Sequence, residues 1–239
     1  MKDWNYDNDQ WTKLPPHLKH LPLFTRHFDL FSYIMRVLWA IVLKGWFFRF
    51  YMRLKVIGNY EEIYKNHPRL LIISNHASHL DAVSIAASIP FKYWLDVYIA
   101  AAKDYFFSNP LFTFFSQHCL GAIPIDRREK KSEAVTLCIS LLNQLDRIWL
   151  ILFPEGTRSN DGKIHEFKRG VSIFSEKTKT PILFLYIKGN AELWPKSAMF
   201  ARPGKLHIYI GPVHAPGPID EVYADYKKWV ETINPGIFA

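Results

Sequence analysis

From residue 54 onward, short apolar runs alternate with segments of helical pattern, and this alternation most constrains the fold. The runs 70–74 (LLIIS) and 148–153 (IWLILF) are apolar almost throughout, which is typical of strands buried on both faces of a parallel sheet. Strands that alternate with helices indicate an α/β fold. We therefore predict a mixed, largely parallel sheet flanked by helices. The expected strands are 54–57, 70–74, 97–101, 122–125, 148–153, 182–187 and 206–210, and the expected helices are 60–65, 78–88, 110–118, 132–145, 168–177 and 219–230.

The segment 28–51 is strongly apolar and long enough to reach across a bilayer. Arg36, Lys44 and Arg49 interrupt it, and a charge at mid-membrane costs roughly 2.5–3.5 kcal/mol. This favours a membrane-associating helix that lies in the interface, with its cations reaching lipid headgroups. A helix packed on its own domain and a membrane-spanning helix remain alternatives. Gly45 is a candidate break between two helices.

Three parts are expected along the chain: a polar tail (1–27), a membrane-associating helical segment (28–52) and one domain (53–239). The tail is broken by prolines and rich in histidine. It carries early acidic residues and has neither a compact apolar region nor a small-residue cleavage site, so it does not resemble a signal peptide.

The chain combines a net charge of +8 with 16% aromatic residues. Cations with aromatics suit either nucleic acid or an anionic membrane surface, and a large core with an incidentally basic surface is a third possibility. Two cysteines exclude a disulfide scaffold and make a reducing compartment the simplest expectation. The mean hydropathy of −0.07 is too low for a multi-pass membrane protein.

The motif NHASHLD (75–81) follows the apolar run 70–74, and ligands of open α/β sheets collect at the carboxyl ends of strands. If His76 precedes the next helix and Asp81 lies in its first turn, the carboxylate can orient the imidazole as a general base. Two alternatives remain open. Asp81 can instead cap the helix through the backbone of Ser78, or His76, His79 and Asp81 can bind a metal ion.

A second motif, FPEGTRS (153–159), also follows an apolar strand. Gly156 permits a tight turn, Arg158 can bind a phosphate with two hydrogen bonds, and Thr157 adds a hydroxyl donor. Glu155 can orient the arginine or an acceptor hydroxyl. The alternative is a loop held together by a Glu155–Arg158 ion pair.

A third motif, GAIPIDR (121–127), brings Arg127 to a strand end, and Lys103 follows the expected strand 97–101. An anionic headgroup is a natural partner for such cations, whereas the basic run after Arg127 is typical of a solvated helix entry. The sequence has no G-x-S-x-G elbow, Walker A loop or G-x-G-x-x-G motif. A serine acyl-enzyme, nucleotide hydrolysis and hydride transfer are therefore not supported.

Taken in order, the blocks resemble those of the glycerolipid acyltransferase family, typified by 1-acyl-glycerol-3-phosphate acyltransferase. That family carries N-H-x4-D, G-x-[IF]-x-[IV]-x-R, F-P-E-G-[TS]-R-S and an apolar strand with proline. The corresponding segments here are 75–81, 121–127, 153–159 and 180–183, and a further F-K-x-G match lies at 167–170.

The resemblance implies that His76 removes the proton of an acceptor hydroxyl while Asp81 orients it. The hydroxyl then attacks a fatty acyl thioester directly. The residues expected to hold or shape the acceptor are Arg127, Glu155, Gly156, Thr157, Arg158, Lys103 and Pro181. Phe184 replaces a second proline that is frequent in the fourth block, which affects selectivity more than chemistry.

The activity implied is O-acyl transfer to a lysophospholipid, most simply 1-acyl-glycerol-3-phosphate, from acyl-CoA or acyl-carrier protein, with no cofactor and no metal. The resemblance also implies membrane association, and we expect it at the cytoplasmic face, without nucleic acid as a partner. Alternatives are another lysolipid or glycerol phosphate as acceptor, a non-catalytic lipid-binding protein with the same fold, and a metal-dependent hydrolase.

Overall fold

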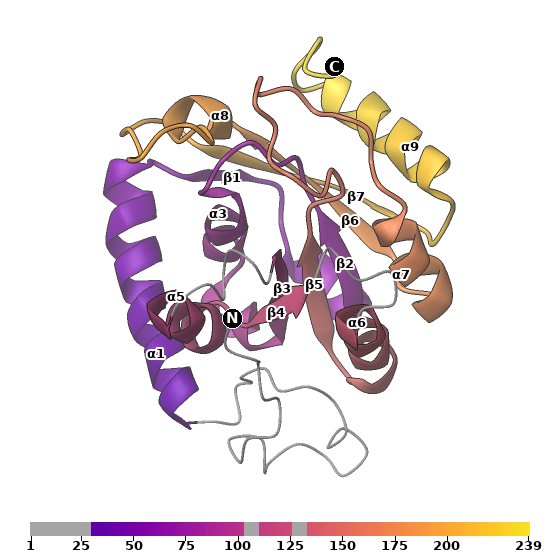
Figure 1. Ribbon diagram of the computed structural model, residues 1–239, viewed down its shortest axis with the longest axis horizontal. Helices are drawn as coiled ribbons and strands as arrows, with labels where there is room; N and C mark the ends of the chain where they lie inside the picture. The colour runs from indigo at the N-terminus through magenta and orange to yellow at the C-terminus, as the bar shows by residue number, and fades with distance from the viewer. Residues whose placement is uncertain (1–29, 103–109, 126–132) are drawn as a thin grey trace.

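The computed structural model describes residues 30–102, 110–125 and 133–239, which form one seven-stranded sheet with helices on both faces (Figure 1). The strand order is β1-β7-β6-β2-β5-β3-β4. All neighbouring strands are parallel except β6 and β7. The predicted mixed, largely parallel sheet is therefore confirmed. The strands are β1 (Lys55–Ile57), β2 (Arg69–Ile73), β3 (Val97–Ala102), β4 (Ala122–Ile125), β5 (Ile148–Leu152), β6 (Ile182–Lys188) and β7 (His207–His214).

Every expected helix within the described residues has a counterpart, although the expected helix 78–88 begins only at Asp81. The short helices η4 and α8 were not predicted. The helices are α1 (Leu30–Ala40), the π-helix η3 (Ile41–Tyr51), α2 (Glu61–Asn66), α3 (Asp81–Ser88), the 3₁₀-helix η4 (Phe91–Asp96), α5 (Pro110–Phe114), the π-helix η5 (Phe115–Cys119), α6 (Glu133–Gln144), α7 (Gly170–Thr178), α8 (Asn190–Leu193) and α9 (Ile219–Glu231).

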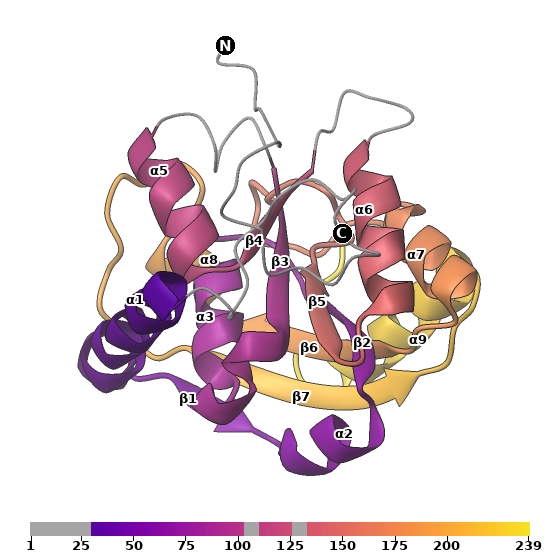
Figure 2. The same ribbon diagram turned by 90° about the horizontal axis from the view of Figure 1, so that it is seen from below.

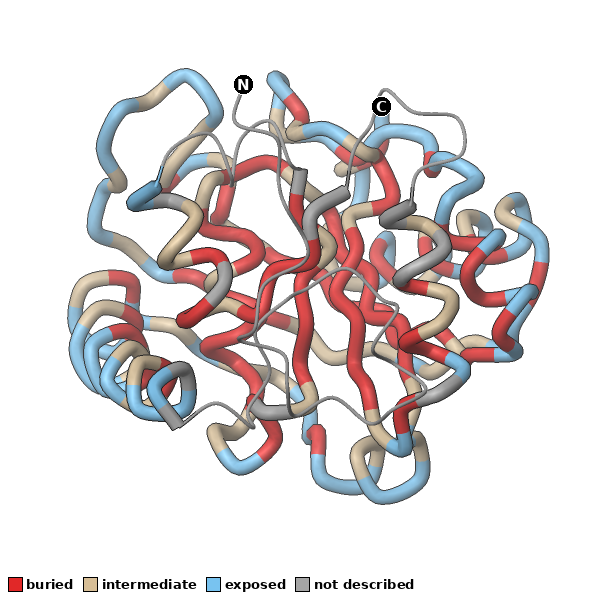
Figure 3. Tube along the Cα trace, turned by 60° about the horizontal axis from the view of Figure 1, so that its bottom comes forward, coloured by how far each residue is buried: buried red, intermediate tan, exposed pale blue. Residues whose placement is uncertain are grey.

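The sheet divides the core into two layers because side chains alternate along each strand. Leu71 and Ile73 of β2 pack with α6, α7 and α9. Leu70 and Ile72 pack on the other face with η3, α2, α3 and η4. Figure 3 shows the central strands buried along most of their length, which explains why their sequences are apolar on both faces.

Strands β2 to β6 all run in the same direction, so their carboxyl ends share one edge of the sheet, here called the carboxyl edge. Ile73 at the end of β2 is in register with Leu152 at the end of β5 and with Phe184 of β6. The turns that follow β2, β5 and β6 therefore emerge close together. This edge is where the sequence places its polar motifs.

The N-terminal helical segment is continuous from α1 into η3, so the expected break at Gly45 does not occur. Arg36 is only 2% exposed, and its Nη1 donates to the carbonyl of Trp94 at 3.2 Å. Lys44 Nζ donates to the carbonyl of Ile89 at 2.6 Å, and burial lowers the pKa of Lys44 to about 8. The prediction that both cations reach lipid headgroups is wrong, because each binds a backbone carbonyl of its own domain.

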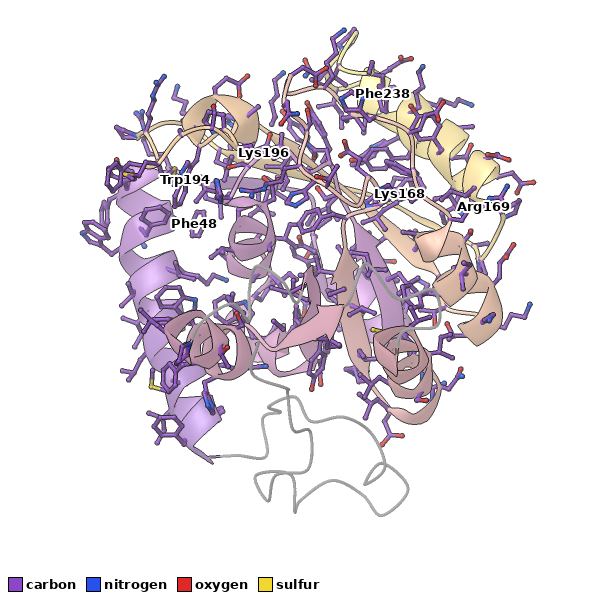
Figure 4. The ribbon with its side chains drawn as sticks, in the orientation of Figure 1. Phe48, Lys168, Arg169, Trp194, Lys196 and Phe238 are labelled. Carbon is purple, nitrogen blue, oxygen red and sulfur yellow. The ribbon has the colours of Figure 1, made fainter. Side chains whose placement is uncertain are left out.

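The inner side of this helix packs on the domain, as the alternative of a helix packed on its own domain predicted. The outer side carries a set of exposed apolar side chains, here called the outer helix face: Phe31, Tyr33, Ile34, Leu38, Ile41, Val42, Trp46 and Phe50. Figure 4 shows Phe48 on the inner side, directed toward α3. Within the described residues, no helix is both long enough and apolar enough to cross a membrane.

Candidate active site

His76 lies three residues beyond the end of β2, at the carboxyl edge. Its Nδ1 is 2.8 Å from Oδ2 of Asp81, the first residue of α3. The imidazole stacks on Phe153, which follows β5, with ring centroids 4.0 Å apart. With Nδ1 donating to the carboxylate, Nε2 keeps the lone pair that a general base needs. The side chain of His76 is 16% exposed, so the ring is held in place yet accessible.

Asp81 is fully buried and binds more than the imidazole. Its Oδ2 also accepts hydrogen bonds from the backbone amides of Ala77 and Ser78, each at 2.8 Å. Its Oδ1 accepts from Asn190 Nδ2 at 2.8 Å. The helix-capping alternative and the His76–Asp81 pair therefore occur together, because one carboxylate holds the turn and orients the ring.

Asn190 is a site residue that the sequence analysis missed. It begins α8 two residues after β6 ends, and so lies at the carboxyl edge. Gly189 precedes it with φ +93°, and a Cβ at that position would lie 2.7 Å from the carbonyl oxygen of Lys205. The signal available in the sequence was a glycine–asparagine pair after a buried strand.

Asn75 supports the same turn from the other side. Its side chain bonds both backbone groups of Ile187 in β6, at 3.0 Å and 2.8 Å. Its backbone amide donates to the hydroxyl of Tyr226 from α9 at 3.1 Å. Asn75 thus fastens the end of β2 to β6, which fixes where His76 leaves the sheet.

The side chain of Glu155 joins the FPEGTRS motif to the NHASHLD motif. It is 4% exposed, and its two oxygens accept from the amides of His76 at 2.8 Å and His165 at 3.2 Å. The amide of Ser159 donates to the carbonyl of His76 at 2.7 Å, which adds a second link. Both oxygens of Glu155 are thus used on backbone amides, rather than on Arg158 as the ion-pair alternative proposed.

Burial raises the pKa of Glu155 from 4.5 to about 7, although the two backbone amides oppose this shift. A carboxyl group with a raised pKa in the folded state stabilises the fold at low pH and loses that contribution as the pH rises. We expect Glu155→Gln to remove a fall in stability of roughly 3 kcal/mol between about pH 4.5 and pH 7. Thermal unfolding of both proteins across this range measures the effect.

Glu166→Gln is the matched control, because Glu166 is an exposed glutamate from the same segment. It should keep the pH profile of the wild type. A Glu155→Gln profile that parallels the wild type would show that Glu155 does not titrate in this range.

Arg158 reaches the His76 turn through His79. Its Nη1 lies 2.5 Å from Nδ1 and 2.6 Å from Nε2 of His79. Burial and the positive charge of Arg158 lower the pKa of His79. The His79 ring also packs against Trp194, with centroids 5.2 Å apart. A neutral His79 beside Arg158 leaves this corner of the site positively charged and suited to an anion.

Gly156 and Thr157 form the turn that carries Arg158. Gly156 has φ +70°, and a Cβ at that position would lie 2.9 Å from Cδ of Lys168, so a larger residue would displace the lysine. Thr157 is exposed. Together with Glu155 and Arg158, these residues lie at the carboxyl edge beside His76, as predicted.

Lys103 and Arg127 lie outside the described residues, although the strands that precede them, β3 and β4, end at the carboxyl edge. Pro181 was predicted as a wall of the acceptor site, and the structure places it elsewhere. It directly precedes β6, at the opposite edge, where it lines a separate pocket with Arg69 and Asp146.

The metal alternative has no support from the part of the chain that the structure describes, where no three His, Cys, Asp or Glu side chains are grouped to hold an ion. Nδ1 of His76 faces Asp81, and both ring nitrogens of His79 face Arg158. A cation between His79 and Arg158 would meet a positive guanidinium.

Comparison with known sequences gives a consistent result. The 1-acyl-sn-glycerol-3-phosphate acyltransferase BAT2, chloroplastic, of Brassica napus is 26% identical over 178 residues, covering 72% of this chain and 47% of that protein. The enzyme of the same name from Limnanthes alba is 28% identical over 171 residues, covering 69% and 57%. That of Pseudomonas aeruginosa is 34% identical over 85 residues, covering 35% and 32%. The chain spans about half the length of the plant relatives it matches.

A solved structure has a similar fold. The crystal structure of the 1-acyl-sn-glycerophosphate (LPA) acyltransferase PlsC from Thermotoga maritima matches with a TM-score of 0.64 and 23% identity, over 84% of this chain and 77% of that chain. The family model described as Acyltransferase matches residues 55–188, which is more than half of the chain and includes His76, Asp81 and Arg158. The chain therefore belongs to the acyltransferase family.

Proposed function

We propose that this chain transfers a fatty acyl group from a thioester to the hydroxyl of a lysophospholipid, with 1-acyl-glycerol-3-phosphate as the acceptor. The observation that carries the proposal is the oriented His76–Asp81 pair, 2.8 Å apart, with Arg158 held against the same turn by His79. The pair suits activation of a hydroxyl, and the arginine suits a phosphate. The names of the relatives support this choice of acceptor.

In the proposed reaction, Nε2 of His76 takes the proton of the acceptor hydroxyl as its oxygen attacks the thioester carbonyl. The new C–O ester bond forms and the C–S bond breaks. The proton then passes from His76 to the departing thiolate, which leaves as a thiol. Asp81 stabilises the imidazolium that exists between these two proton transfers. The donor is acyl-CoA or acyl-carrier protein, and no cofactor takes part.

We further propose that the enzyme works at the cytoplasmic face of a membrane. The outer helix face presents apolar side chains on one side of an amphipathic helix, which suits a lipid interface. Cys119 and Cys138 are free and buried, which agrees with a reducing compartment. The test of the whole proposal is a transfer assay on membranes that pairs a panel of lysolipids with acyl-CoA and acyl-carrier donors.

The phosphate role of Arg158 leads to a specific expectation. Arg158→Ala should lower kcat/KM for phosphate-bearing acceptors by roughly 10- to 100-fold, because a hydrogen bond to a charged group contributes about 1.5–3 kcal/mol. A neutral acceptor such as a monoacylglycerol should be affected much less. Arg169→Ala, which removes an exposed arginine before α7, is the control. An equal loss on both kinds of acceptor would contradict the phosphate role.

A further inference from the structure

Residues 194–205 of the loop between α8 and β7 carry the two most exposed large apolar side chains in the described part of the chain. Met199 is 80% exposed and Phe200 is 76% exposed. The loop base is ordered by its own hydrogen bonds, from the amide of Ala198 to the carbonyl of Pro195 and from Trp194 Nε1 to the carbonyl of Ala198. A folded turn therefore presents both side chains to solvent. Two such side chains left in water contribute no hydrophobic stabilisation to the isolated chain.

This loop lies beside the end of the N-terminal helix. The hydroxyl of Tyr51 donates to the carbonyl of Ala201 at 2.9 Å, and the amide of Gly204 donates to the carbonyl of Tyr51 at 3.2 Å. Figures 1 and 2 both show the loop after α8 running next to this helix. Trp46 and Phe50, the last members of the outer helix face, are also mostly exposed. The loop tip therefore adds to the apolar surface of that face.

The charges carried by the helix end and by the loop are of one sign. The segments 46–58 and 193–219 contain no aspartate or glutamate, and the nearest acidic residue in sequence is Glu192 on α8. The exposed cations of the helix end and of the loop are Arg49, Arg53, Lys196, Arg202 and Lys205. Apolar side chains surrounded by cations match an anionic bilayer, in which acyl chains lie below negative headgroups.

We propose that the 194–205 loop is a second lipid-contacting element, which inserts Met199 and Phe200 into an anionic bilayer surface. A second copy of the chain is a poorer partner, because docking through the same face would bring like charges together. The inference rests on the proposed attachment to a lipid surface and extends it from the helix to this loop. It does not depend on acyl transfer, since lipid contact is measured without turnover.

The base of the loop is attached to the candidate active site. Ser78 Oγ donates to the carbonyl of Trp194 at 2.7 Å, and the His79 ring packs on Trp194. His79 Nε2 also lies 3.4 Å from the carbonyl oxygen of Lys196, which Figure 4 labels on the same loop as Trp194. Insertion of the loop tip would therefore place the turn that carries His76 and His79 next to the surface from which a lysolipid arrives.

A fluorophore on the loop tip tests this proposal directly. Burial raises the pKa of Cys119 to about 11 and that of Cys138 to about 12, so a new cysteine at Met199→Cys can be labelled selectively with a solvent-sensitive dye. The probe membranes are phosphatidylcholine vesicles with and without phosphatidylglycerol, each carrying a spin-labelled lipid. We expect a blue shift and quenching with the anionic vesicles. Ile173→Cys, at an exposed position on α7, should show neither change.

A binding assay gives the second readout. Met199→Ser with Phe200→Ser should weaken sedimentation with anionic vesicles by about tenfold or more, because two apolar insertions are lost. Its thermal midpoint should match the wild type, since both side chains are exposed. Trp46→Ser with Phe50→Ser tests the helix separately.

The proposal is overturned if the label at 199 stays in water while the protein is bound through its helix, and the proposed attachment to membranes then still stands. It is also overturned if the double serine variant still binds vesicles as the wild type does but no longer forms a dimer.

Discussion

Replacing His76 by alanine should lower acyl transfer by about 10²–10⁴-fold, the usual contribution of a positioned general base. The expected loss follows from the geometry of the ring. Nδ1 is committed to Asp81 at 2.8 Å, and stacking on Phe153 fixes the plane of the imidazole, so Nε2 is held in one direction. Alanine removes the base and leaves the buried carboxylate in place. The measurement is kcat with membrane-presented 1-acyl-glycerol-3-phosphate.

His214 provides a matched control within the same chain. Its Nε2 lies 3.1 Å from Oδ2 of Asp225, and its side chain is 15% exposed, close to the 16% of His76. His214 ends β7 and pairs with Ile182, so it lies at the opposite edge of the sheet. The His214→Ala variant should keep the turnover of the wild type. If folded His76→Ala retains full activity, the general-base mechanism is wrong.

The parts of the site that sequence predicted are those that depend on local order alone. Runs such as 70–74 and 148–153 are apolar because β2 and β5 are covered on both faces, and this makes their ends easy to locate. A polar motif directly after each strand then lies at the carboxyl edge in any parallel arrangement. His76, Asp81 and Arg158 follow from this rule without knowledge of the strand order.

Contacts that depend on the order of the strands in the sheet were not predicted. The bond from Asn190 to Asp81 exists because β6 pairs with β2, a neighbour relation that no local pattern specifies. Pro181 was misplaced for a different reason, because its role came from the resemblance to the family. A motif that begins a strand lies at the opposite edge from a motif that ends one, and Pro181 directly precedes the expected strand 182–187.

The N-terminal helix shows a different limit of sequence reasoning. Hydropathy treats Arg36 and Lys44 as charges that must face water or headgroups, yet each donates a hydrogen bond to a carbonyl within the domain. A cation that finds a backbone partner can lie on the inner side of a helix. Most of the exposed positions that remain, such as Trp46 and Phe50, are apolar, and Arg49 is an exposed cation among them.

Asp81→Asn should lower transfer to a similar extent, about 10²–10⁴-fold, because a neutral amide cannot stabilise the imidazolium formed during proton transfer. It should also destabilise the fold by about 1–3 kcal/mol, since an amide nitrogen then faces a buried donor. With the amide oxygen in the place of Oδ2, that donor is Asn190. Activity and chemical denaturation of the same preparation measure the two losses.

A second substitution separates these two losses. Adding Asn190→Asp to Asp81→Asn returns a carboxylate to the pair of side chains at 81 and 190, with the acceptor now on residue 190. The amide of residue 81 can then donate to it while its oxygen still accepts from Ala77, Ser78 and His76. Stability should recover in the double variant, whereas turnover should stay low because the charge no longer lies against the ring. Recovery of both would show that Asp81 acts only through the structure of the turn, and that His76 needs no adjacent carboxylate.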